Sequence, residues 1–351
     1  MSWTGSACLV STRCGRRRTR CPPGPRSPTR RHGCGVCTAE DLIPVRLAVR
    51  RFLAAHADSD FDVAVSGGAD SLALAEAAAH EGHKRGLRVR ALIVDHGLQE
   101  GSGRIAEEAA AAARGLGVDE AEVLTVEVTG GGGIEGAARR ARYAALAGKG
   151  SGLVLLGHTR DDQAETVLLG LGRGSGPRSI AGMKPFDPPW GRPLLDVPRS
   201  ATRAACAALG VRPWEDPFNT EPRFTRVRLR TEVLPLLEKV LSGGVAAALA
   251  RTARQLREDL ETLDALAAQI PFDGEVKALE NHPPALRRRV LRRWLLEHGG
   301  CDLSDAQLRS VDALVGEWRG QGGVWLPGGL VVARTHGTLS MNRRSCQSGQ
   351  E

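Results

Sequence analysis

The sequence predicts an α/β fold in which a parallel sheet carries helices on both faces, followed by a smaller, mostly helical domain that ends in a short β-hairpin. Four short apolar runs between about residues 60 and 171 each have the length of one buried strand. Ala-rich stretches of helical length separate them, and this alternation is typical of parallel sheets covered on both sides. Beyond Pro235 the pattern changes to helices. Ligands of such folds bind beyond the carboxyl ends of the strands.

The expected elements follow from these runs. The predicted strands are Asp62–Ser66, Val89–Asp95, Val123–Val128 and Leu153–Gly157. The predicted helices between them are Asp70–Lys84, Arg104–Leu116 and Glu135–Ala147, and residues 172–190 are expected to form a long ordered loop. In the second domain we expect helices at Val245–Leu266, Pro284–Glu297 and Ser304–Trp318, and a hairpin within Gly322–Met341.

Charge and cysteine are concentrated at the N-terminus. Net charge is +8, but eight arginines lie between Arg13 and Arg31, and without them 40 basic residues balance 40 acidic ones. Cys34 and Cys37 resemble half of a zinc or iron–sulfur site, yet the segment lacks regularly spaced partners. We interpret residues 1–39 as a basic, Cys/Pro/Arg-rich disordered extension and residues 342–351 as a disordered tail. No apolar stretch reaches the length of a membrane span, so we expect no membrane partner and a cytoplasmic location.

The most specific motif, SGGADS, follows the first predicted strand and opens a helix. Its residues are Ser66, Gly67, Gly68, Ala69, Asp70 and Ser71. The glycines allow backbone amides to approach an anion, and the helix N-terminus adds partial positive charge. A carboxylate beside a polyphosphate indicates a bridging cation, so Asp70 predicts a Mg²⁺ ligand. The alternative is an ordinary turn in which Asp70 or Ser71 caps the helix.

Other polar groups lie where the chain would return to this loop. Asp95 and His96 end the second strand, although simple turn chemistry also explains them. Arg139 and Arg142 share one helix face, where a solvated charge run is the alternative. The fourth strand ends in a block whose members His158, Asp161, Asp162 and Glu165 are richer than helix capping requires.

Basic residues farther along the chain could contact nucleic acid. Arg226, Arg228 and Arg230 recur at every second position beside aromatic residues. A second cluster lies within Arg287–Arg293, where some arginines are expected only to solvate the outer helix face.

Together, these motifs resemble those of the PP-loop ATP pyrophosphatases and, within them, the tRNA(Ile)-lysidine synthases. The similar pieces are SGGADS, DHGL at 95–98, E-x3-R-x2-RY at 135–143, HTRDDQAET at 158–166, GRGSG, RPLL and F-x-R-x-R-x-R. The resemblance implies that residues 40–236 form a PP-loop catalytic domain and residues 237–341 a helical tRNA-binding domain. It also implies ligation of L-lysine to C2 of the wobble cytidine in the isoleucine tRNA with anticodon CAU. ATP would adenylate the C2 oxygen, and AMP and pyrophosphate would be released.

The resemblance also implies roles for these residues. Catalysis would involve Asp70, Arg139, Arg142, His158, Asp161 and Asp162; the SGGADS loop would hold ATP, with Mg²⁺ on Asp70. Substrate binding would involve Asp95, His96, Glu165, Arg226, Arg228 and Arg230. A homodimer is left open. The alternative is another PP-loop enzyme that thiolates cytidine or uridine at C2, but it needs a reactive cysteine near ATP, and residues 40–236 contain only Cys206.

Overall fold

The computed structural model describes residues 38–99, 101–129, 133–150, 152–174 and 176–343. Residues 1–37 of the predicted extension 1–39, including Cys34 and Cys37, and residues 344–351 of the predicted tail 342–351 lie outside the described residues. No single helix in the described part of the chain has the length and hydropathy needed to cross a membrane; one pair bent by 95°, Thr225–Val240 with Val245–Ala268, meets that test jointly.

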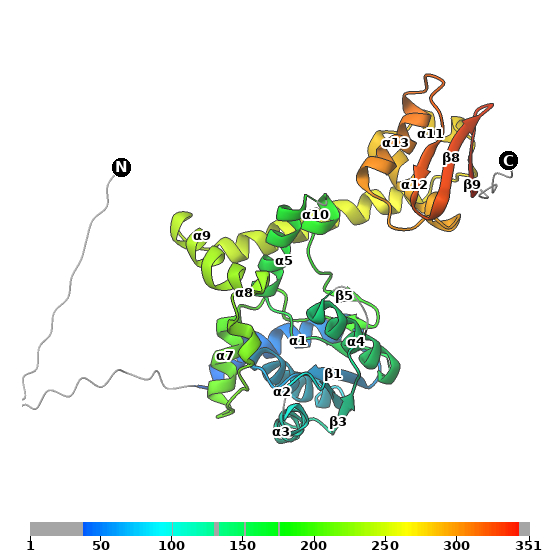
Figure 1. The fold of residues 1–351 in the computed structure, drawn as a ribbon. Helices are drawn as coiled ribbons and strands as arrows, with labels where there is room; N and C mark the ends of the chain where they lie inside the picture. The colour runs from blue at the N-terminus through cyan, green and yellow to red at the C-terminus, as the bar shows by residue number, and fades with distance from the viewer. Residues whose placement is uncertain (1–37, 100, 130–132, 151, 175, 344–351) are drawn as a thin grey trace, which may run out of the picture. The chain divides into compact units, whose positions relative to one another are not determined.

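A six-stranded sheet forms the framework of the first part of the chain (Figure 1), in the order β3-β2-β1-β4-β6-β5. The strands are β1 (Phe61–Val65), β2 (Val89–Asp95), β3 (Glu120–Thr125), β4 (Val154–Leu155), β5 (Phe186–Asp187) and β6 (Trp190–Gly191). All neighbouring pairs are parallel except β5 and β6, which pair antiparallel at the edge. The predicted parallel sheet is therefore confirmed, with an antiparallel edge strand that the sequence pattern did not indicate.

Helices cover both faces of this sheet, as predicted. Alternate side chains of β1 and β2, such as Val63 and Ile93, join a core that also contains buried residues of α1, α2, α3 and α7. The intervening positions, such as Leu92, join a second core with Leu146 of α4. Because side chains alternate across a strand, a strand buried on both faces reads as a continuous apolar run rather than an alternating one.

The first part contains the three predicted helices and several that were not predicted. They are α1 (Ile43–His56), α2 (Ala69–His83), α3 (Ser102–Gly115), α4 (Ile134–Lys149), α5 (Arg160–Arg173), α6 (Pro177–Ile180), α7 (Arg199–Ala208), α8 (Thr225–Arg228) and α9 (Leu234–Val240). Short helical turns occur at Ala39–Leu42, Pro217–Thr220 and Leu229–Val233. The expected loop 172–190 contains α6 and β5, so it is more regular than predicted.

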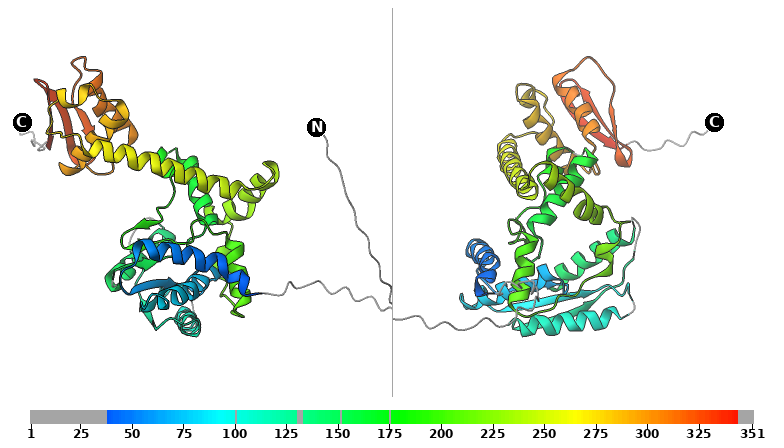
Figure 2. Two further views of the ribbon diagram at one scale, coloured as in Figure 1. Left: turned by 180° about the vertical axis from the view of Figure 1, so that it is seen from behind. Right: turned by 90° about the vertical axis from the view of Figure 1, so that its left-hand side faces the viewer.

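The second part contains α10 (Val245–Ala268), α11 (Lys277–Glu280), α12 (Pro284–Glu297) and α13 (Asp305–Gly316). Figure 2 shows α10 as one unbroken helix. The predicted hairpin is part of a three-stranded antiparallel sheet, β7 (Val324–Leu326), β8 (Leu330–Thr335) and β9 (Thr338–Arg343). This sheet shares a core with α12 and α13 that includes Leu291, Leu295, Leu314 and Val332.

The strand order places a topological switch point at β1. Its two neighbours, β2 and β4, lie on opposite sides. In open α/β sheets ligands bind beyond the carboxyl ends of the strands at such a point, and this region is called the crevice below. Gly157, just after β4, allows the chain to pack closely against the segment after β1, since a Cβ there would lie 3.2 Å from the backbone of Asp70 and Ser71. The two most specific sequence motifs therefore meet at this point.

Candidate active site

The segment Ser66–Ser71, called the phosphate loop below, joins β1 to α2. Gly67 has φ of +80°, a conformation that favours glycine, and its carbonyl accepts a hydrogen bond from the backbone of Trp214 at 2.9 Å. The Ser71 hydroxyl lies 3.1 Å from the backbone nitrogen of Ser66 and 2.9 Å from the carbonyl of Gly68. The serines thus fix the shape of the loop internally.

The first turn of α2 offers backbone N–H groups to a ligand. Its N-cap is Gly68, and no side chain caps the helix. The amides of the first helical turn have no partner within the helix, and they carry its partial positive charge. The alternative in which Asp70 or Ser71 caps α2 is therefore not what the structure contains, and this helix end has the character of an anion site.

Asp70 faces the beginning of α7 rather than open solvent. Its carboxylate accepts hydrogen bonds from the Thr202 hydroxyl and from Nε of Arg199, the latter at 3.2 Å. Burial raises the pKa of Asp70, and the contacts with Thr202 and Arg199 oppose this effect. Neither Thr202 nor Arg199 was expected from the sequence.

The three carboxylates Asp161, Asp162 and Glu165, called the α5 carboxylates below, lie at the start of α5 across from the phosphate loop. Asp162 forms a capping box with Thr159, accepting from its backbone nitrogen and hydroxyl at 2.8 Å each. Its other oxygen lies 2.6 Å from Nη2 of Arg199. Burial would raise the pKa of Asp162, but Arg199 and the Thr159 hydrogen bonds lower it. Capping and charge pairing therefore both act on one side chain.

Asp161 and Glu165 have different surroundings. Asp161 accepts a hydrogen bond from the backbone nitrogen of Arg199 at 2.8 Å, so it caps the start of α7. The Glu165 side chain is fully buried and pairs with Arg230, whose Nε lies 2.8 Å from Oε1. Arg226 lies 3.7 Å from the same carboxylate. A catalytic role for Asp161 stays a prediction beside this structural one.

The structure brings only part of the arginine segment to the site. Arg226 and Arg230 reach Glu165, whereas Arg228 forms an exposed ion pair with Glu232 at 3.2 Å. Arg139 lies 5.0 Å over the Tyr143 ring and donates to its hydroxyl. Any contact of Arg139 or Arg228 with substrate stays a prediction.

Several buried nitrogens near the crevice have no protein partner. These include Nδ1 of His96, Nδ1 of His158 and Nε of Arg192. Burial lowers the pKa of His158 to about 4, so its ring is neutral near pH 7. Burial also lowers the pKa values of His96 and Arg142. Buried donors and acceptors are normally satisfied, so these orphaned atoms are suited to bind a polar ligand.

Asp95 and the arginines of α12 have mainly local partners. Asp95 accepts from the backbone nitrogen of Gly97 at 3.0 Å, which agrees with a turn role. Of the α12 cluster, Arg287 pairs with Asp312, and Arg289 with Asp264, at 2.8 Å each. Arg293 donates to the backbone carbonyl of Ile270 at 2.8 Å. Much of this cluster therefore stabilises the fold.

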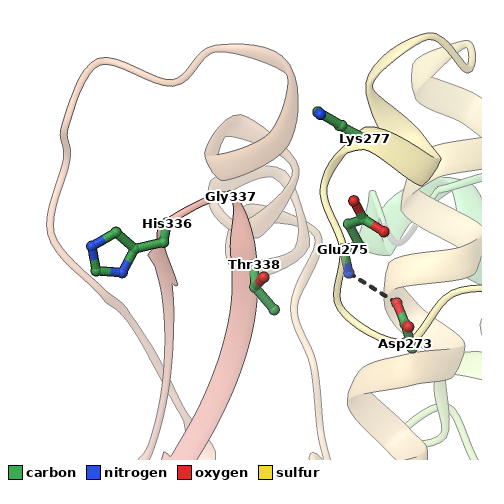
Figure 3. A pocket seen from close by; sticks show the side chains of 6 residues that line it. All are labelled: Asp273, Glu275, Lys277, His336, Gly337 and Thr338. Carbon is green, nitrogen blue, oxygen red and sulfur yellow. Dashed lines mark hydrogen bonds between the residues drawn. The ribbon is translucent and has the colours of Figure 1, made fainter.

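A cavity of about 360 Å³ lies far along the sequence from the phosphate loop (Figure 3). It is lined by Asp273, Glu275, Lys277, His336, Gly337 and Thr338. The Asp273 carboxylate accepts from the backbone nitrogen of Glu275 at 3.1 Å. Two carboxylates against one lysine make this cavity unfavourable for a polyphosphate. We therefore place the candidate active site at the phosphate loop and the α5 carboxylates.

Comparison with known proteins agrees with this geometry. Residues 44–237 match the family model described as a PP-loop domain, and residues 275–340 match the TilS substrate binding domain. The tRNA(Ile)-lysidine synthase of Rhodococcus opacus (strain B4) is 59% identical over 313 residues, which cover 86% of this chain and 95% of that protein. That of Nocardia farcinica (strain IFM 10152) is 58% identical over 316 residues, with coverage of 86% and 98%. The chain belongs to the tRNA(Ile)-lysidine synthase family.

Among solved structures, the U34-tRNA thiolase NcsA from Methanococcus maripaludis with its 4Fe-4S cluster aligns with a TM-score of 0.48 and 19% identity, covering 63% of this chain and 81% of that one. In this tRNA(Ile)-lysidine synthase family member, the residues that match the PP-loop domain, 44–237, include both the phosphate loop and the α5 carboxylates. They also include Arg199 and Thr202, which the sequence motifs did not single out. No sequence signal singled these two residues out, because no helix was predicted over Arg199–Ala208.

Proposed function

We propose that this protein ligates L-lysine to C2 of the wobble cytidine in tRNA(Ile) with anticodon CAU, using ATP. The observation that carries the proposal is the pairing of an uncapped glycine loop with three carboxylates across one crevice at the switch point. The loop suits a polyphosphate, and the carboxylates suit a cationic amine. The family membership and the matched substrate binding domain support tRNA as the second substrate.

In the first step the C2 oxygen attacks the α-phosphate of ATP, an O–P bond forms, and pyrophosphate leaves. The backbone amides of the first turn of α2 would bind the phosphate oxygens, since they carry partial positive charge and lack a capping side chain. Arg142 lies close enough to His158 to influence its charge, and burial lowers the pKa values of both groups. We assign them to orienting the base and the phosphate.

A magnesium ion fits the loop only together with ATP. Among the described residues, no group of three or more His, Cys, Asp or Glu side chains could hold a metal unaided. Mg²⁺ accepts one or two carboxylates and completes its octahedron with phosphate oxygens and water. Asp70 would therefore hold the ion jointly with the phosphates. The ion would offset the charge that develops on the leaving pyrophosphate.

In the second step the lysine amine attacks C2, a C–N bond forms, and AMP leaves with the C2 oxygen. The amine must lose a proton. Asp162 is ionised near pH 7, because Arg199 and Thr159 lower its pKa, and it is therefore suited to hold the ammonium. We assign the same carboxylate to accept the proton, although its lowered pKa makes it a weaker base than an unperturbed aspartate. Glu165 would add a second negative charge to the lysine pocket. Arg226 and Arg230 limit that charge by pairing with it.

The decisive test is incorporation of labelled lysine into a tRNA(Ile) transcript with anticodon CAU in the presence of ATP. Asp70→Ala is expected to abolish incorporation, because the carboxylate that would bridge to the phosphates is lost. Lys184→Ala, a change of an exposed charge paired only at 3.7 Å with Asp187, is the matched control. Unimpaired turnover by the Asp70→Ala variant would mean that ATP does not bind at the phosphate loop.

Thiolation, the second candidate reaction, needs a reactive cysteine at the crevice. Cys206 is buried and its Sγ donates to the carbonyl of Ala69 at 3.3 Å, so it lies against the phosphate loop. Burial raises the pKa of its thiol to about 11, which keeps it protonated and unreactive near pH 7. Nothing in the described part of the active site therefore favours sulfur transfer.

Cys206→Ala is accordingly expected to retain lysine incorporation within about 3-fold of the wild type. Removing one buried sulfur costs some stability but leaves every group assigned to the reaction in place. In the wild type, alkylation of Cys206 by iodoacetamide is expected to stay slow at pH 8 and to accelerate only toward pH 11. Labelled lysine in the tRNA measures the first, and peptide mass spectrometry measures the extent of alkylation at each pH. Rapid modification at pH 8 together with loss of activity in the alanine variant would favour sulfur chemistry instead.

A further inference from the structure

One guanidinium joins the two halves of the crevice. Arg199, the first residue of α7, has only 14% of its side chain exposed. Its Nε lies 3.2 Å from Asp70 in the phosphate loop, and its Nη2 lies 2.6 Å from Asp162 in α5. Its Nη1 lies 3.6 Å from the fully buried Glu165. A planar guanidinium presents its donors as a rigid fork, so each of its nitrogens meets a different carboxylate.

This placement has an electrostatic cost at the helix and a gain among the carboxylates. A cation at a helix N-terminus opposes the helix dipole. Asp161 offsets this by capping the backbone nitrogen of Arg199. Asp70, Asp162 and Glu165 repel one another, and the sequence supplies the neutralising charge from a segment far from all three. A side chain with a structural role alone would not need to contact all three carboxylates.

We propose that Arg199 is a positioning residue that couples the ATP half of the site to the lysine half. This proposal rests on the proposed function, which assigns Asp70 to the phosphates and Asp162 to the amine. Arg199 acts on both. Through Asp70 it sets how far the carboxylate extends beside the phosphate loop. Through Asp162 and Glu165 it sets the spacing of the groups that receive the ammonium. Because one rigid group spans both halves, it fixes the distance between the adenylated oxygen and the attacking amine.

The coupling is first tested without any substrate, by thermal unfolding of a double-mutant cycle. Arg199→Ala is expected to lower Tm because it leaves neighbouring buried carboxylates without their shared cation. Asp70→Asn removes one of those charges. The double variant is therefore expected to melt higher than the sum of the two single shifts predicts. Strictly additive shifts would overturn the proposal.

The functional test uses lysine incorporation into the tRNA(Ile) transcript by three purified variants with wild-type circular dichroism. Arg199→Ala is expected to reduce incorporation by about 100-fold, the scale of a misplacement of roughly 1 Å at a reacting centre. Arg199→Lys is expected to recover part of the loss, because an ammonium restores the charge but cannot form the fork. Arg203→Ala, which removes an exposed arginine one turn later on α7, is the matched control and should keep full activity.

Chemical rescue separates positioning from folding. Guanidinium ion at non-denaturing concentration is expected to raise incorporation by Arg199→Ala at least several-fold, while leaving the wild type and Arg203→Ala unchanged. A folded Arg199→Ala variant with activity within about 3-fold of the wild type would overturn the proposal. Loss of activity that is restored neither by the Arg199→Lys substitution nor by added guanidinium ion would also overturn it. If the wild type itself incorporates no lysine, the proposed function fails, whereas the unfolding cycle still decides whether Arg199 couples the two elements.

Discussion

Asp162→Asn is expected to reduce lysine incorporation by about 10²–10⁴-fold, the usual contribution of a positioned general base. Asparagine is nearly isosteric, and its carbonyl oxygen can still accept from Thr159, which caps α5 through this side chain. It carries no negative charge, however, so it can neither hold an ammonium nor take its proton. Arg199 loses one carboxylate partner but keeps Asp70 and Glu165, so we expect the larger loss in chemistry and lysine binding and a smaller one in stability.

The same variant should keep its response to nucleotide. ATP with Mg²⁺ is expected to raise the Tm of Asp162→Asn about as much as that of the wild type, since Arg199 keeps its contacts with Asp70 and Glu165 and the phosphate loop is unchanged. Asp196→Asn, which alters a carboxylate with 75% of its side chain exposed, serves as the matched control and should incorporate lysine normally. Normal incorporation by Asp162→Asn would mean that another group accepts the proton.

The pH dependence of the wild type distinguishes the proton acceptor from the amine. Arg199 and Thr159 lower the pKa of Asp162 in spite of its burial, so this carboxylate is already ionised below neutral pH. His158 has a pKa of about 4 and is neutral there too. If Asp162 accepts the proton from the bound ammonium, the rate of lysine incorporation should therefore be nearly constant between pH 6 and 9, and neither side chain should add a step near pH 6.5. A rate that rises with the fraction of free amine would mean that the amine binds already deprotonated.

The architecture was predictable because its signals are local. Strand β2 has the bounds that its apolar run indicates, and α12 spans Pro284–Glu297 as predicted. Strand β3 lies three residues earlier than expected, since Glu120 and Glu122 take ladder positions that composition alone does not assign to a strand. The short strands β5 and β6, of two residues each, are too brief to leave a periodic signal.

The candidate site was predictable only where a motif follows a strand. The phosphate loop and the α5 carboxylates meet because β1 and β4 are parallel neighbours, which the fold class implies. Arg199 and Thr202 were missed because they lie 129 and 132 residues beyond Asp70, in a helix that carries no motif of its own. Likewise, the regular spacing of Arg226, Arg228 and Arg230 could not reveal that the middle one pairs with Glu232 instead of the site. Long-range partners depend on tertiary packing, which residue spacing does not encode.

Glu165→Ala is expected to lower stability by about 3 kcal/mol, the lower end of the cost of breaking a buried ion pair. The carboxylate is fully buried, and Arg230, Arg199 and Arg226 lie 2.8, 3.6 and 3.7 Å from it. Its removal leaves these cations facing one another with less compensation. We take the lower end because about a third of the Arg230 and Arg226 side chains is exposed, where water screens the repulsion.

At about 2–4 °C per kcal/mol for a domain of this size, the expected fall in Tm is about 6–12 °C, measured by differential scanning calorimetry without ligands. Arg228→Ala breaks an exposed pair in the same segment and should leave Tm unchanged. Combining Glu165→Ala with Arg230→Met should recover part of the loss, because one of the uncompensated cations is then removed. If the double variant instead melts lower than Glu165→Ala alone, the cost arises from lost packing, and the carboxylate does not act through charge.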